Sequence, residues 1–389
     1  MNKSFNLSPV AAALLLAATS SFADSSTSIV EQNGSENSAS VTQQATMDAY
    51  ADVLTTGNNN EVIVVQRNSA GVIIGSSGVS PGIVQEGNDN KAVIRQRSGS
   101  DDAEAAIYQA GNASDNDAKI IQETGSTFAF ASIDQYASEA GIAAITQTDA
   151  PDSIATILQE ETFSSTATVA QTGSLQDADI YQFSTDLSTG SIEQMGGGNI
   201  AAIEQEATVT TFATISQNGL NNGALIAQYS NLLDTIDSMA SVTQSGGDHI
   251  VQLFQDDTQR GTATVNQSGA LNAAYLDQAT VADSTATVTQ SGDDNIATVG
   301  QHVGTELHAF ITQGGSVNDL FTDQTGYYNG LTIDQTSTST NNSATIYQSG
   351  TGSLGFENSA SITQTGNMDS ATITQSGGGG NSVAILQGL

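Results

Sequence analysis

Several residue types are absent or scarce in this chain of 389 residues. It has no cysteine, no tryptophan and 3 prolines, and its 41 Asp and Glu outnumber only 7 Lys and Arg. Without cysteine, the chain can form no disulfide framework, thiolate metal site or cysteine nucleophile. Its net charge of -34 repels phosphate backbones, so we expect no nucleic-acid binding. Only 12% of the residues are charged, which also argues against a charge-rich disordered tail.

Combinations of residues that support catalysis are equally scarce. The only histidines are His249, His302 and His308, and none lies in a His-Glu-x-x-His or Gly-x-Ser-x-Gly context. The four glycines at 377–380 lack the lysine of a phosphate-binding loop. The sequence therefore predicts no enzyme, no cofactor and no metal centre.

The acidic residues fall chiefly in expected turns and at outward strand positions. A negative surface of this kind keeps separate chains soluble through mutual repulsion. Acidic turns such as residues 292–295 also supply hard oxygen ligands, although they form no full EF-hand loop. Calcium binding at these turns stays an open alternative.

The first 23 residues have the pattern of an export signal. A cationic start containing Lys3 precedes an apolar run at 10–18, and Ala23 follows as the small residue at a cleavage site. We expect residues 1–23 to be removed and the mature chain to begin at Asp24. No later stretch is apolar enough to span a membrane, so we expect export through the periplasm without membrane insertion.

Glutamine recurs along the remaining chain at 29 positions, mostly 11 or 12 residues apart. In 28 cases an aliphatic residue lies two positions earlier, Thr322 being the exception, and in 21 cases Ala lies four positions earlier. This period of two places Ala, the aliphatic residue and Gln on one face of a β-strand. Thr55 stands where the repeat expects a further Gln.

Many of these strands are followed by a turn of the form Gln-x-Gly-x-x-Asn, whose Gly and Asn tolerate positive φ. Two strands and two turns in about 23 residues leave no room for a crossover helix and fit one rung of a solenoid. We therefore expect an all-β fold, a β-solenoid of about fifteen stacked two-strand rungs over residues 24–389, with an irregular insertion at about 67–84. The turn glycines include Gly34, Gly87, Gly269 and Gly292.

Stacked rungs lie ~4.8 Å apart, so amides at equivalent positions can form parallel, in-register hydrogen-bonded ladders. A buried amide that loses one partner costs about 1–3 kcal/mol, so an uncapped end rung favours another copy of the chain. We see no capping repeat near Ser28 or Gln387 and expect head-to-tail self-assembly. The expected ladder residues are Gln43, Gln96, Gln171, Gln217, Gln244, Gln267, Gln290, Gln301, Gln364, Gln375, Asn37, Asn90, Asn272 and Asn295.

The full consensus, Gln-x-Gly-x-x-Asn-x-Ala-x-aliphatic-x-Gln, is realised at residues 32–43, 85–96 and 290–301. It resembles the curlin repeat of curli-type bacterial amyloid fibres. The resemblance implies a secreted structural subunit that polymerises on the outer cell surface, in biofilm matrix and cell adhesion. It also implies a nucleator subunit and outer-membrane secretion machinery as partners. The chain has more repeats than familiar curlins and no evident separate secretion-targeting segment. A capped, monomeric β-solenoid adhesin and a minor nucleator subunit remain open alternatives.

Overall fold

A computed structural model describes residues 13–14, 25–74, 82–230, 235–336 and 340–388. The chain divides into two compact units, Met1–Ser164 and Ser165–Leu389, which we call unit 1 and unit 2. Apart from residues 13 and 14, the expected export signal lies outside the described residues. These two residues form the short strand β1 (Ala13–Leu14), which pairs with Ser38 and Ala39 of β3.

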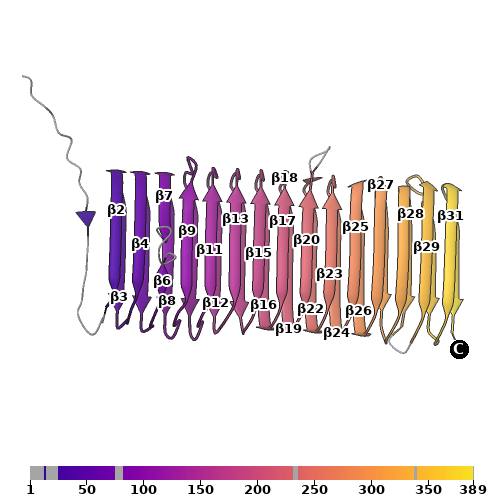
Figure 1. Ribbon diagram of the computed structural model, residues 1–389. Coiled ribbons are helices and arrows are strands. Elements are labelled where there is room, and N and C mark those ends of the chain that lie inside the picture. The colour runs from indigo at the N-terminus through magenta and orange to yellow at the C-terminus, as the bar shows by residue number, and fades with distance from the viewer. Residues whose placement is uncertain (1–12, 15–24, 75–81, 231–234, 337–339, 389) are drawn as a thin grey trace, which may run out of the picture. The chain divides into compact units, whose positions relative to one another are not determined.

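Unit 1 consists of parallel strands that alternate between two sheets along the chain, and Figure 1 shows successive strands of one sheet side by side. Its A sheet contains β2 (Thr27–Ser35), β4 (Tyr50–Asn58), β6 (Ile73–Ile74), β7 (Ile83–Asn88), β9 (Glu104–Ala110), β11 (Phe130–Tyr136) and β13 (Ile154–Glu160). Its B sheet contains β3 (Ser38–Gln44), β5 (Glu61–Arg67), β8 (Lys91–Arg97), β10 (Asp117–Glu123) and β12 (Ile142–Thr148).

Unit 2 repeats this arrangement. Its A sheet contains β15 (Asp177–Phe183), β17 (Ile200–Glu206), β20 (Gly223–Tyr229), β23 (Ile250–Asp256), β25 (Ala273–Ala282), β29 (Ser343–Thr351) and β31 (Ser370–Gly378). Its B sheet contains β14 (Thr166–Thr172), β16 (Thr189–Gly197), β19 (Phe212–Leu220), β22 (Met239–Gly247), β24 (Thr262–Ala270), β26 (Thr285–Asp293), β30 (Asn358–Gln364) and β32 (Ser382–Gln387). The long strands β27 (Ile296–Gln313) and β28 (Asp319–Gln335) run through both sheets, and β18 (Thr208–Val209) pairs with β21 (Thr235–Ile236).

The expected all-β solenoid of about fifteen two-strand turns is confirmed. Strands pair in parallel and in register, so that Ala213, Ile215 and Gln217 of β19 lie opposite Ala240, Val242 and Gln244 of β22. Within the described part of the chain there is no helix, and hence none that is long and apolar enough to cross a membrane.

The core of each rung is narrow and built from the repeated triplet. In β14, for example, Ala167, Val169 and Gln171 are buried, whereas Thr168 and Ala170 point outward. Small Ala and β-branched residues suit a pleated surface that faces a second sheet at short distance. The inward and outward positions therefore follow the period of two in the sequence.

The irregular segment between Gln66 and Gln85 interrupts a strand of the A sheet. β4 pairs with β6 through Tyr50 and Ala51 and with β7 from Val53 onward. The intervening residues 75–81, which include Pro81, lie outside the described residues.

Candidate functional site: buried amide ladders

In unit 1 the inward glutamine side chains form two runs of hydrogen bonds along the stacked rungs. In each bond the Nε2 of one glutamine donates to the Oε1 of the glutamine on the following rung, over 2.8–3.0 Å. One run joins Gln43, Gln66, Gln96, Gln122 and Gln147, and the other joins Gln85, Gln109, Gln135 and Gln159.

Unit 2 contains two longer runs of the same kind, with distances of 2.7–3.0 Å. In the B sheet the run joins Gln171, Gln194, Gln217, Gln244, Gln267, Gln290, Gln313, Gln335, Gln364 and Gln387. In the A sheet it joins Gln182, Gln205, Gln228, Gln255, Gln278, Gln301, Gln324, Gln348 and Gln375. Every bond has the same direction, with the donor nearer the N-terminus, so each run is polar.

Many of the ladder amides also join one sheet to the other. Gln290, on β26 of the B sheet, donates from Nε2 to the carbonyl oxygens of Ala273 and Asn295, both at 3.0 Å. Ala273 belongs to β25 of the A sheet. The amide therefore satisfies backbone acceptors across the rung as well as the side chain of the next rung.

The asparagines that precede the strands form a second, shorter kind of ladder. The Oδ1 of Asn272 accepts from the backbone N and Nδ2 of Asn295, at 3.0 and 3.1 Å. Its Nδ2 donates to the carbonyls of Ser268 and Gly292. Near the start of unit 1, Asn37 accepts from the backbone N of Asn60, which in turn accepts from that of Asn90.

His249 occupies one asparagine position in this column. Its backbone N donates to Asn222, and its Nδ1 accepts from the backbone N of Asn272 at 3.3 Å. The ring is fully buried. It is therefore a ladder member at a turn, which leaves it no access to a substrate.

The turn glycines have positive φ, with Gly269 at 100° and Gly34 at 119°. They also permit a close approach between rungs. A Cβ on Gly269 would lie 2.1 Å from the carbonyl oxygen of Gly292, and one on Gly34 would lie 1.8 Å from that of Gly57. Only glycine allows successive turns to stack this closely.

Sequence reasoning missed a hydroxyl ladder at turns without asparagine. Ser165 lies 2.9 Å from Thr185 between hydroxyl oxygens, and the hydroxyl of Ser188 accepts from that of Thr211 at 3.1 Å. All four side chains are buried. The available signal was a Ser or Thr two residues before the inward Ala or Gly, as at Ser165, Ser188 and Thr211, at the place that Asn takes elsewhere.

Thr55 breaks the A-sheet ladder of unit 1. It lies in register between Gln32 and Gln85 and is fully buried. Its hydroxyl is too short to reach either amide, so the Nε2 of Gln32, the Oγ1 of Thr55 and the Oε1 of Gln85 are buried without a hydrogen-bond partner. Orphaned buried polar atoms destabilise a fold by about 1–3 kcal/mol each.

Replacing Thr55 by Gln should join Gln32 to Gln85 and stabilise the first rungs. We expect Thr55→Gln to gain about 2 kcal/mol, since it removes three unsatisfied atoms at the expense of one side chain's rotamer entropy. Slower amide hydrogen exchange in β2 and β4 would measure the gain. The neighbouring outward substitution Thr56→Gln adds an amide outside the ladder and should leave exchange unchanged. Equal effects of the two variants would contradict the ladder.

Asp134 is an outward carboxylic acid whose acidity is strongly altered. Burial, followed by repulsion from Glu160, raises the pKa of its carboxyl from 3.8 to about 6. Its Oδ1 has no hydrogen-bond partner. The folded chain therefore binds this proton more tightly than the unfolded chain, and the free energy of unfolding falls as the pH rises from about 4 to about 6.

Removing this charge should stabilise unit 1 at neutral pH. We expect Asp134→Asn to raise the stability by about 1 kcal/mol at pH 7, after allowing for solvent screening, and by almost nothing at pH 4. Chemical denaturation at both pH values measures the difference. Asp283→Asn is the control, because Arg260 lowers the pKa of Asp283 and its loss should be mildly destabilising at pH 7. An equal gain in the free energy of unfolding of Asp134→Asn at both pH values would contradict the raised pKa of Asp134.

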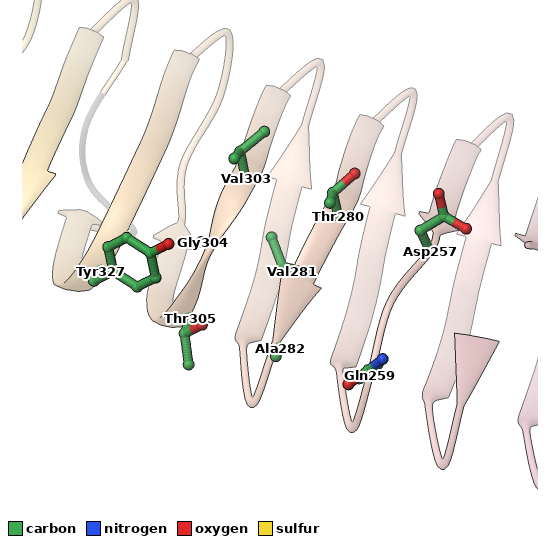
Figure 2. A pocket seen from close by; sticks show the side chains of 9 residues that line it. All are labelled: Asp257, Gln259, Thr280, Val281, Ala282, Val303, Gly304, Thr305 and Tyr327. Atoms are coloured by element: carbon green, nitrogen blue, oxygen red, sulfur yellow. The ribbon is translucent and has the colours of Figure 1, made fainter. Parts of the chain in front are cut away.

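A groove of about 240 Å³ runs over the connections between the sheets of unit 2. Figure 2 shows its side chains spread along successive rungs, with Asp257 near one end and Tyr327 near the other. Within the described residues there is no group of three or more Asp, Glu or His that could hold a metal ion. Its lining offers no paired acid and base, and consists of Asp257, Gln259, Thr280, Val281, Ala282, Val303, Gly304, Thr305 and Tyr327.

These features define a repeat protein: a β-solenoid whose rungs are joined by buried amide ladders and closely stacked glycines. The model of the family described as the curlin associated repeat matches residues 282–315 and 354–377. The curlin associated repeat is therefore recognised in two regions of the chain, in agreement with the sequence resemblance. No curated protein matches the chain.

Proposed function

We propose that the chain is the secreted subunit of an extracellular, curli-like amyloid fibre, in which copies stack head to tail through the Gln and Asn ladders. The curlin repeat and the β-solenoid fold support a structural subunit of this kind. By the same family relationship, the fibre serves cell adhesion and biofilm matrix. A nucleator subunit and outer-membrane secretion machinery are its proposed partners.

The observation that carries this proposal is the polar, incomplete pairing of the terminal rungs. Within the described residues, β31 pairs only with β29 and β32 only with β30. Their glutamines, Gln375 and Gln387, accept from the preceding rung, and each donates from its Nε2 to a backbone carbonyl of the opposite sheet. The second hydrogen of each Nε2 is thus available to a further rung.

The N-terminal rung of a second copy offers the matching groups. β2 would continue the A sheet after β31. Once the expected export signal, which contains β1, is removed, β3 would continue the B sheet after β32. Gln32 and Gln43 would then accept from Gln375 and Gln387. Addition of a copy would pair the strand edges and extend the ladders, which is the mode of growth of cross-β fibres.

Seeded growth of the purified mature chain tests the proposal. We expect dye-binding filaments with a meridional reflection near ~4.8 Å, and shortening of the lag by preformed filament fragments. A chain that stays monomeric in the presence of seeds would contradict fibre formation. That outcome would favour the alternative of a monomeric β-solenoid adhesin.

A further inference from the structure

The few cations of this acidic chain gather at one place. Five of its 7 Lys and Arg point outward from β5, β8 and β10, three neighbouring strands of the B sheet in unit 1. We call this group the cationic patch, and it consists of Arg67, Lys91, Arg95, Arg97 and Lys119.

Only part of this charge is neutralised within unit 1. Arg97 forms an ion pair with Glu123 at 2.8 Å, and Lys91 lies 3.9 Å from Glu61. Among the described residues, no carboxylate lies within ion-pair distance of Arg67, Arg95 or Lys119. The patch therefore keeps a positive surplus on a chain whose net charge is -34.

The arrangement within the patch is unfavourable when nothing covers it. Arg67 lies directly in register with Arg97, so two like charges stand on adjacent strands. Arg95 lies in register between Val65 and Ile121, which are apolar. The Nε of Arg97 is buried without a hydrogen-bond partner. Carboxylates placed over this surface would relieve the repulsion between the cations.

The A sheet of unit 2 presents the complementary surface. Its outward positions carry carboxylates and no Lys or Arg on two pairs of strands, β15 with β17 and β23 with β25. The strand between the pairs, β20, carries no outward charge. Burial and neighbouring carboxylates raise the pKa values of Asp177 and Asp277, as expected for acids that repel one another. We call this surface the acidic face, and it consists of Asp177, Asp179, Glu204, Glu206, Asp256 and Asp277.

We propose that the cationic patch of one copy binds the acidic face of a second copy, and so joins neighbouring fibres side by side. This proposal rests on the proposed function. Both surfaces are parallel sheets with the same spacing between rungs, so cations on adjacent strands of the patch can face carboxylates on β15 and β17, or on β23 and β25. Apolar side chains lie within both surfaces, Val65 and Ile121 in the patch and Ile200 and Ile250 beside the acids. Such side chains suit a second copy better than a fully hydrated polyanion.

Removing the unpaired cations tests the proposal while leaving the ladders intact. We expect Arg67→Ser/Arg95→Ser/Lys119→Ser filaments to elongate at the normal rate but to stay single at about 0.01 M salt, where wild-type filaments bundle. Lateral affinity should fall about tenfold or more. Wild-type bundles should also separate at about 0.5 M salt. Arg260→Ser, which removes a cation outside the patch, is the control and should bundle normally.

Exchanging the charges between two chains identifies the partner surface. Arg67→Glu/Arg95→Glu/Lys119→Glu should not bundle alone, but should bundle when mixed with Asp179→Lys/Glu206→Lys. Bundle width by electron microscopy is the measurement, and filament growth by dye fluorescence is read separately. Normal bundling of the serine variant would overturn the proposal, as would failure of the charge exchange. If the serine variant binds dextran sulfate more weakly but bundles normally, the cationic patch would instead be a binding surface for an anionic polymer.

Failure of fibre formation would be distinguishable from failure of this inference. If the chain forms no filaments, the same variants are compared as soluble chains by sedimentation at about 0.01 M salt. If wild-type chains associate in a salt-sensitive way and the serine variant does not, the result would still support contact between the cationic patch and the acidic face. Absence of such pairing would overturn it.

Discussion

Replacing Gln290 by Ala should be among the most damaging single changes in unit 2. The glutamine accepts from Gln267 at 2.7 Å and donates to Gln313 at 2.8 Å. It also satisfies the carbonyls of Ala273 and Asn295. Loss of the side chain orphans several buried polar atoms, at about 1–3 kcal/mol each, and leaves a cavity. We expect a local destabilisation of about 4 kcal/mol or more.

Hydrogen exchange of the β24, β26 and β27 amides measures this effect, because a repeat array need not unfold in one step. Protection should fall in these strands and in few others. Thr289→Ala is the matched control, since Thr289 is the outward neighbour of Gln290 and lies in register with Asn266 outside the glutamine ladder. Under the proposed function, seeded growth should slow for Gln290→Ala and stay near normal for Thr289→Ala. Similar losses for both variants would show that the inward amide has no special role.

A methyl group on Gly269 should have an effect of similar size for a different reason. It would lie 2.1 Å from the carbonyl oxygen of Gly292, which belongs to the backbone of the next rung and cannot move aside alone. Positive φ adds about 1–3 kcal/mol of strain for any residue with a Cβ. We expect Gly269→Ala to lose about 3 kcal/mol or more and to open the stacking between β24 and β26.

A substitution at Gly377 distinguishes the effect of the steric clash at Gly269 from the effect of backbone strain at positive φ. Its φ is 113°, close to the 100° of Gly269, but a Cβ there meets nothing within 4 Å. Gly377→Ala should therefore show only the strain in the soluble chain, by thermal or chemical denaturation. In a head-to-tail fibre the same methyl group would face Gly34 of the next copy, so growth should slow more than stability falls. Equal destabilisation by the two variants would argue against close stacking of the turns.

The periodic positions were largely predictable from the sequence. The triplet that ends at Gln217, for instance, predicts its inward face, its register and its neighbours, because the same three residue types recur in most rungs. Turn conformation at Gly34 and Gly269 was predictable for the same reason, since only glycine tolerates that φ at so crowded a position.

Other features depend on the lateral arrangement of rungs and had no local signal. Arg67 and Arg97 are 30 residues apart because of the insertion, yet they lie side by side. The repeat predicts a turn after Gln301. In the structure, Gly304 and Thr305 pair with neighbouring rungs, so β27 continues through this turn as one strand of 18 residues. At Thr55 the sequence showed a missing glutamine but could not show that three polar atoms are left buried.

Disulfide trapping tests head-to-tail stacking most directly, because the chain contains no cysteine of its own. Leu386 is exposed on β32, and Thr42 occupies the equivalent outward position on β3. In the proposed fibre, their Cα atoms in adjacent copies lie about one strand spacing apart, ~4.8 Å, within the range for a disulfide. Filaments of Thr42→Cys/Leu386→Cys, oxidised and then denatured, should give a series of covalent multimers. Thr289→Cys/Leu386→Cys filaments should stay monomeric. Filaments of the first variant that grow normally but yield only monomers would contradict stacking of the last rung on the first.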